Sequence, residues 1–135
     1  MAQMNFRENE YKELGLAARW LDLEHARHAY RFALQFSNKK RYGLDESTVD
    51  DIERHLIESP SVSHAWLKAR VAAEGSVQIV YGEDQVCVIE TKDFLDQWQN
   101  IFLPARDDAI VLHNLNRMVI FYCHEEELEV GLRNV

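Results

Sequence analysis

The spacing of apolar residues changes along the chain, from a helical period in the first half to a period of two in the second. In the first half, Asp22 precedes a segment in which apolar residues recur every three or four positions. This pattern predicts an amphipathic helix with Asp22 as its N-cap, because an aspartate side chain accepts hydrogen bonds from the free N–H groups of a first turn. The apolar face would carry Ala26, Ala29, Phe32, Ala33 and Phe36.

Two further helices are predicted before residue 75. Ser47 or Thr48 is a suitable cap for the second helix, which would have acidic residues near its positive N-terminal end. Its apolar face would carry Val49, Ile52 and Leu56. Pro60 separates this segment from a third helical stretch at residues 62–73. Residues 5–21 fit either a helix or an opening strand.

From Ser76 onward, apolar and polar residues alternate, which is typical of strands that bury one face. Strands are predicted over Val77–Tyr81, Gln85–Glu90, Ala109–His113, Met118–Cys123 and Leu128–Val130. A helix at residues 92–102, capped by Thr91, has one apolar stripe and is expected to lie against the sheet. The last strand alternates with Glu127 and Glu129, a pattern that predicts a charged edge strand.

Helices first and mostly antiparallel strands afterwards predict an α+β fold. The N-terminal helices would pack on a C-terminal sheet of four to five strands with one inserted helix. We expect a single domain over residues 1–135, with a mainly helical part at 1–75 and a sheet part at 76–135. A chain of 135 residues is long enough to bury a core without disulfides or metal ions.

Composition narrows the class of protein. The formal net charge of −8 argues against direct nucleic-acid binding, because phosphate contacts require clustered lysine and arginine. The first residues contain no apolar stretch of the kind found in secretory signals, and no run of about 18 apolar residues predicts a membrane span. Cytoplasm is therefore the expected compartment.

Residues with reactive or metal-binding chemistry have simpler structural interpretations. Glu24 and His28 are four residues apart, but no third metal ligand is close in sequence, so an exposed helix face is the preferred interpretation. Asp107–Asp108 is interpreted as a turn signal, and Cys87 and Cys123 as buried thiols within apolar strands. No glycine-rich phosphate loop, Gly-x-Ser-x-Gly turn or Cys-x-x-Cys pair is present. We therefore expect no catalytic residue, metal ion or cofactor.

Acidic residues gather in two places, one in the predicted second helix and one at the end of the chain. Because alternate side chains of a strand share a face, the acids of the C-terminal segment would form a row. Such clusters are candidates for contact with a basic partner. The partner-binding residues predicted from the sequence are Asp45, Glu46, Asp50, Asp51, Glu53, Glu125, Glu127 and Glu129.

The C-terminal half resembles a known class of protein. The resemblance rests on Val88–Thr91, on Phe94 and Trp98, and on the closing segments Tyr122–Glu125 and Glu129–Arg133. This pattern resembles small bacterial immunity proteins of polymorphic toxin and contact-dependent inhibition systems, over about residues 81–133. The resemblance implies a cytoplasmic protein that neutralises a cognate toxin domain, often a nuclease, by binding it tightly. Contact residues vary within this class, so none is transferred to this chain.

We therefore expect a non-enzymatic immunity protein whose acidic surface binds a basic toxin domain. An alternative is a small ligand-binding or enzymatic domain with a cleft between helices and sheet, using His113, Glu90 and His124. Another alternative is a housekeeping homo-oligomer, for example a homodimer, that pairs through an exposed strand or helix.

Overall fold

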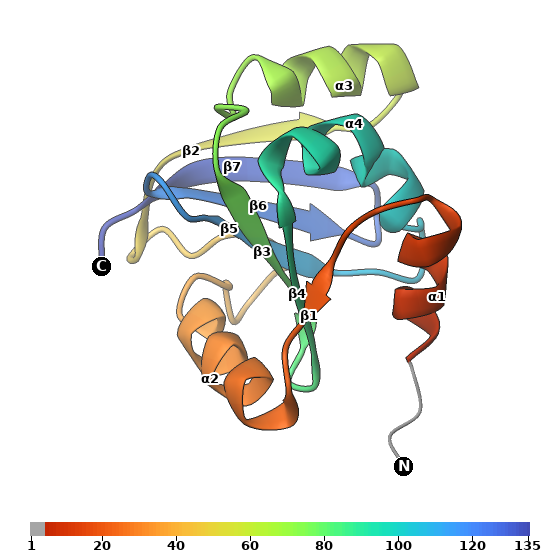
Figure 1. Ribbon diagram of the computed structural model, residues 1–135. Helices are drawn as coiled ribbons and strands as arrows, with labels where there is room; N and C mark the ends of the chain where they lie inside the picture. Colours follow the sequence, from red (N-terminus) through yellow and green to blue (C-terminus); the bar gives the residue numbers. More distant parts are fainter. Residues whose placement is uncertain (1–4) are drawn as a thin grey trace.

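The computed structural model describes residues 5–135, and this part of the chain forms four helices and one seven-stranded sheet (Figure 1). The helices are α1 (Phe6–Glu13), α2 (Leu23–Leu34), α3 (Pro60–Lys68) and α4 (Thr91–Ile101). The strands are β1 (Arg19–Trp20), β2 (Val49–Leu56), β3 (Ser76–Gly82), β4 (Gln85–Glu90), β5 (Ala109–His113), β6 (Met118–Cys123) and β7 (Glu127–Arg133). The strand order is β1-β4-β3-β5-β6-β7-β2, and every neighbouring pair is antiparallel. The predicted α+β class is confirmed, but the sheet has more strands than the four to five expected.

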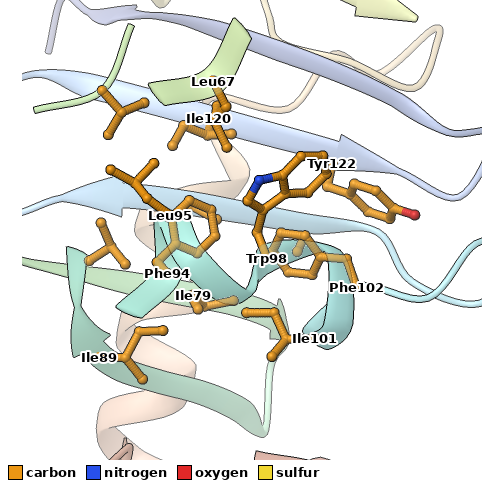
Figure 2. Close-up of a cluster of buried hydrophobic side chains, with 14 of the residues drawn as sticks. Leu67, Ile79, Ile89, Phe94, Leu95, Trp98, Ile101, Phe102, Ile120 and Tyr122 are labelled. Carbon is orange, nitrogen blue, oxygen red and sulfur yellow. The ribbon is translucent and has the colours of Figure 1, made fainter. Parts of the chain in front are cut away.

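The sheet has helices on both faces. Helices α1, α3 and α4 cover one face, and α2 covers the other (Figure 1). Figure 2 shows the first core, in which Trp98 of α4 and Phe102, which follows the helix, pack with Tyr122 of the sheet. The second core contains Ala26 and Ala33 of α2. Central strand β5 is buried along its whole length, because it contributes side chains to both cores.

The best-predicted elements are those with local sequence signals. Asp22 caps α2 as expected, and its carboxylate accepts a hydrogen bond from the His25 N–H at 2.9 Å. The β3–β4 and β5–β6 hairpins are also confirmed. Helix α4 begins at Thr91 itself, with Glu90 in the cap position, so the predicted start is displaced by one residue. The alternative for residues 5–21 resolves into both elements, helix α1 followed by the short strand β1.

The predicted second helix is wrong, because this segment forms strand β2. The register between β2 and β7 shifts between Asp50 and Glu53, and Asp51 has a φ of 55°. This irregularity is a β-bulge, which inserts one extra residue into the strand. Val49 and Ile52 consequently share one face of the sheet although they are three positions apart. A three-residue apolar spacing imitates a helical period, which explains the error.

The prediction of a C-terminal edge strand is also wrong. Strand β7 lies inside the sheet, between β6 and β2. The described edges are β1 and β2, both from the half of the chain expected to be mainly helical. The third helix, predicted at residues 62–73, begins earlier: Pro60 is its first residue, and it ends at Lys68. Proline suits this position, because the first N–H of a helix has no intrahelical acceptor.

Ala105, in the loop after α4, has a strained backbone conformation. Its φ is 62°, a left-handed conformation that costs residues with a Cβ about 1 kcal/mol. We expect Ala105→Gly to stabilise the protein by about 0.5 kcal/mol, because the relief of strain exceeds the larger entropy of the unfolded chain. Urea denaturation measures the change. The matched control is Ala65→Gly at an exposed position of helix α3, which should destabilise the protein by about 1 kcal/mol. Equal destabilisation by both substitutions would contradict the prediction.

Candidate functional site

An open groove of about 750 Å³ lies beside the edge strand β2. It is lined by Arg41, Glu46, Val49, Asp50, Asp51, Ile52 and Arg54. The sequence-predicted residues Glu46, Asp50 and Asp51 therefore share one concave surface. All three are exposed. This groove is the candidate functional site, because it combines concavity with accessible carboxylates.

The bulge in β2 shapes the groove, and Gly131 of β7 makes room for it. A Cβ atom at residue 131 would lie 2.5 Å from Val49 Cγ1 and 2.9 Å from the Asp50 carbonyl oxygen. Only glycine permits this close approach of the two strands. The turn before β2 is fixed by Asp45, which accepts hydrogen bonds from the N–H and hydroxyl of Ser47 at 2.8 and 2.7 Å. These hydrogen bonds lower the pKa of Asp45 below its usual value.

Glu129 is not a surface residue, contrary to the sequence prediction. Its carboxylate is 1% exposed and accepts a hydrogen bond from the Leu44 N–H at 2.9 Å. It also pairs with Arg41 at 2.7 Å and with Arg54 at 3.0 Å. The hydrogen bond to Glu129 raises the pKa of Arg41. Glu129 therefore holds two arginines that line the groove, and it is too buried to contact a partner directly.

The remaining predicted acids do not line the groove. Glu53, on β2, pairs with Arg70 at 3.2 Å rather than facing the groove residues. Glu125 is exposed in the turn between β6 and β7, while Glu127 is half-buried at the start of β7. The expected row of Glu125, Glu127 and Glu129 does not exist as an exposed surface, because the strand carries Glu129 into the interior.

A second buried ion-pair cluster joins α1 to the loop before β5. The Asp107 carboxylate is fully buried and pairs with Arg7 at 2.7 Å and with Arg106 at 2.8 Å. It also accepts a hydrogen bond from the Leu103 N–H at 2.8 Å. Burial by itself raises the pKa of Asp107, but the hydrogen bonds from Arg106, Leu103 and Arg7 outweigh it and hold this pKa below its usual value. The cluster was not predicted, since Arg7 is far from Arg106 and Asp107 in the sequence.

The two adjacent aspartates Asp107 and Asp108 have different partners and do not act as a dyad. Asp108 accepts hydrogen bonds from the His124 N–H at 2.9 Å and from His124 Nδ1 at 2.8 Å. The hydrogen bond to Asp108 raises the pKa of His124. The ring of Tyr42 packs edge-on against that of His124, with their centroids 4.7 Å apart. The interpretation of residues 107–108 as a simple turn therefore missed the ion pairs of Asp107 with the arginines and the hydrogen bonds of Asp108 with His124.

Both cysteines are buried, as predicted. Burial raises the pKa of Cys87 to about 12 and also raises that of Cys123, so neither isolated thiol has the properties of an activated nucleophile.

The polar residues of the ligand-binding alternative do not converge. His113 is buried at the end of β5, where its ring nitrogens contact the Ala72 carbonyl at 3.0 Å and the Leu115 N–H at 3.1 Å. Glu90 is exposed at the start of α4, whereas His124 follows β6, opposite the beginning of β5. An open pocket of about 350 Å³ at the C-terminal end of α4 is instead lined by other residues: Ile57, Pro60, Trp98, Gln99, Asn100, Phe102, Pro104, Tyr122 and Glu126.

Comparison of the chain with protein-family models, with curated proteins and with solved structures finds no match. Within residues 5–135, every helix is too short or too polar to cross a lipid bilayer.

Proposed function

We propose that this chain is a non-enzymatic immunity protein that neutralises a cognate toxin domain by binding it at the groove beside β2. The observation that supports this proposal is a concave surface on an edge strand that displays Asp50 and Asp51 to solvent. Neither carboxylate forms an ion pair with another residue in the described range 5–135. Asp50 accepts a hydrogen bond from the Asn134 side-chain amide at 3.0 Å, and both carboxylates are exposed to a basic partner.

The charges of the groove give it a preference for cations. Glu129 lies beneath Arg41 and Arg54 and pairs with both guanidinium groups. Glu46 lies 3.8 Å from Arg41 and adds a further carboxylate at the rim. With Asp50 and Asp51, the carboxylates that line the groove outnumber the two guanidinium groups. A toxin that binds nucleic acid carries a basic cleft, and electrostatic complementarity would steer that cleft toward this groove.

The bulge favours recognition by side chains over the addition of a partner strand. A regular edge strand offers a row of free backbone groups that can extend a sheet. In β2 the left-handed conformation of Asp51 interrupts this row. The partner would therefore contact carboxylates and the two arginines, which makes binding sensitive to charge substitution.

The test expresses this chain together with the product of the adjacent reading frame, which the proposal requires to be a toxin, and measures neutralisation. We expect the variant D50K/D51N to lose protection of cell growth, with affinity at least about 10-fold weaker, because three units of charge are reversed or removed at the groove. Asparagine is chosen at residue 51 because it tolerates a positive φ. Growth under toxin induction is the readout.

The matched control is E83K/D84N, which changes the same number of charges in the exposed turn between β3 and β4. This control should protect cells as well as the unmodified chain. Equal protection by both variants, with equal urea midpoints, would refute binding at the groove.

A further inference from the structure

We propose that Cys123, His124 and Asp108 bind a single divalent transition-metal ion of the zinc class. One ligand atom from each residue, a sulfur, a ring nitrogen and a carboxylate oxygen, lies within 4.8 Å of the other two. The site is separate from the groove beside β2 and does not depend on toxin binding. Its chemistry follows from where two neighbouring strands place these residues.

The sheet fixes the relative positions of the three side chains. Ala109 of β5 pairs with Tyr122 of β6 in antiparallel register. Asp108 immediately precedes the first residue of this pair, and Cys123 and His124 immediately follow the second. The three residues therefore meet at the same end of two adjacent central strands. Metal sites on such rigid elements are more precisely arranged than sites on free loops.

Hydrogen bonds already orient two of the three groups. The Asp108 carboxylate accepts hydrogen bonds from both the backbone N–H and the ring Nδ1 of His124. This contact holds the His124 ring beside the Asp108 carboxylate, and a metal ion bound by both side chains would replace the proton between them. The Cys123 sulfur accepts one long hydrogen bond, from the Glu125 N–H at 3.4 Å. Binding a metal ion would therefore break at most this one weak hydrogen bond of the sulfur.

The donor set selects the class of ion. Calcium and magnesium prefer oxygen ligands alone, whereas a thiolate, an imidazole and a carboxylate together suit zinc. Three protein ligands leave one coordination position for water or for a group of a partner. The side chains of His124 and Asp108 are 31% and 42% exposed, which gives an ion access from solvent, while the Cys123 sulfur forms the buried end.

Cobalt(II) is the probe for the experiment, with the untagged full chain. We expect one equivalent of cobalt to produce a thiolate-to-metal charge-transfer absorption in the near ultraviolet, and zinc to displace it. Cys123→Ser should abolish the absorption, while Cys87→Ser, which removes the other buried thiol, should leave it unchanged. Absence of the absorption in the unmodified chain at saturating cobalt would overturn the proposal.

Two substitutions at partly exposed side chains keep the test independent of any folding defect in Cys123→Ser. His124→Gln and Asp108→Asn should each weaken cobalt binding at least about 10-fold in calorimetric titrations, because each removes one of the three proposed ligands. Unchanged affinity in both variants would mean that the three residues form only a hydrogen-bonded cluster, which would also overturn the proposal.

Discussion

Glu129→Ala is expected to destabilise the protein by about 3–5 kcal/mol, the usual consequence of removing one partner from a buried ion pair. The Glu129 side chain is 1% exposed, so its carboxylate depends on the protein rather than on solvent for its partners. Its loss leaves the Leu44 N–H without its acceptor and leaves Arg41 without its closest anion. Urea denaturation followed by circular dichroism measures the difference in unfolding free energy.

The control for this prediction is Glu125→Ala, which removes an exposed carboxylate from the adjacent turn. Its effect should remain within about 0.5 kcal/mol, as for most surface substitutions. A similar loss of stability in both variants would show that Glu129 does not hold the structure beneath the groove.

Asp107→Asn is expected to have the second-largest effect, a destabilisation of about 3 kcal/mol. Asparagine keeps an acceptor for the Leu103 N–H but removes the negative charge that pairs with Arg7 and Arg106. Arg7 would then remain largely buried, with only 13% of its side chain exposed, and without its anion. The connection between α1 and the loop before β5 should loosen. Thermal and urea unfolding measure the loss.

The pH dependence gives this prediction a distinct signature. The pKa of Asp107 in the folded protein is below its ordinary value of 3.8, so the unfolded chain binds the proton more readily. The contribution of Asp107 to stability is therefore complete above about pH 4 and decreases as the pH falls through the folded-state pKa. Asp107→Asn should flatten this part of the stability profile.

Asp108→Asn is the matched control, because it changes the neighbouring residue, whose side chain is 42% exposed. It should alter stability by less than about 1 kcal/mol. If Asp107→Asn and Asp108→Asn gave the same stability and the same acid profile, the buried ion-pair cluster would have no energetic role.

The second half of the fold was predictable because its signals are local. Residues 76–123 contain two hairpins and one amphipathic helix, each specified by alternation, a turn and an apolar stripe. The first half was less predictable because its strands depend on distant partners. Strand β2 pairs with β7, far away in sequence, and its bulge gives Val49 and Ile52 a helical spacing. No local pattern contains that pairing.

The candidate site was predictable only in part. The accessible carboxylates Asp50 and Asp51 are visible in the sequence, although they were assigned to a helix rather than to a bulged strand. The burial of Glu129 could not be inferred, because an alternating strand with glutamates resembles a solvent-exposed edge. Its interior position depends on Arg41, which approaches from the loop after α2. Position in the sheet, not residue type, decides which acids remain accessible.

The proximity of Cys123, His124 and Asp108 likewise appears only in three dimensions. Cys123 and His124 are adjacent in sequence, but Asp108 reaches them through the pairing of β5 with β6. The strands were predicted correctly, yet the exact register that aligns their ends was not part of the prediction. Clusters of this kind emerge from register rather than from a sequence motif.

The most direct test of the central claim is the association rate of the purified toxin domain with this chain, measured by surface plasmon resonance at low and high salt. We expect rapid association that slows steeply as salt increases, because opposite charges steer the encounter. D50K/D51N should associate at least about 10-fold more slowly and with a weaker salt dependence, whereas E83K/D84N should match the unmodified chain. An association rate for D50K/D51N equal to that of the unmodified chain at both salt concentrations would contradict binding through the acidic groove beside β2.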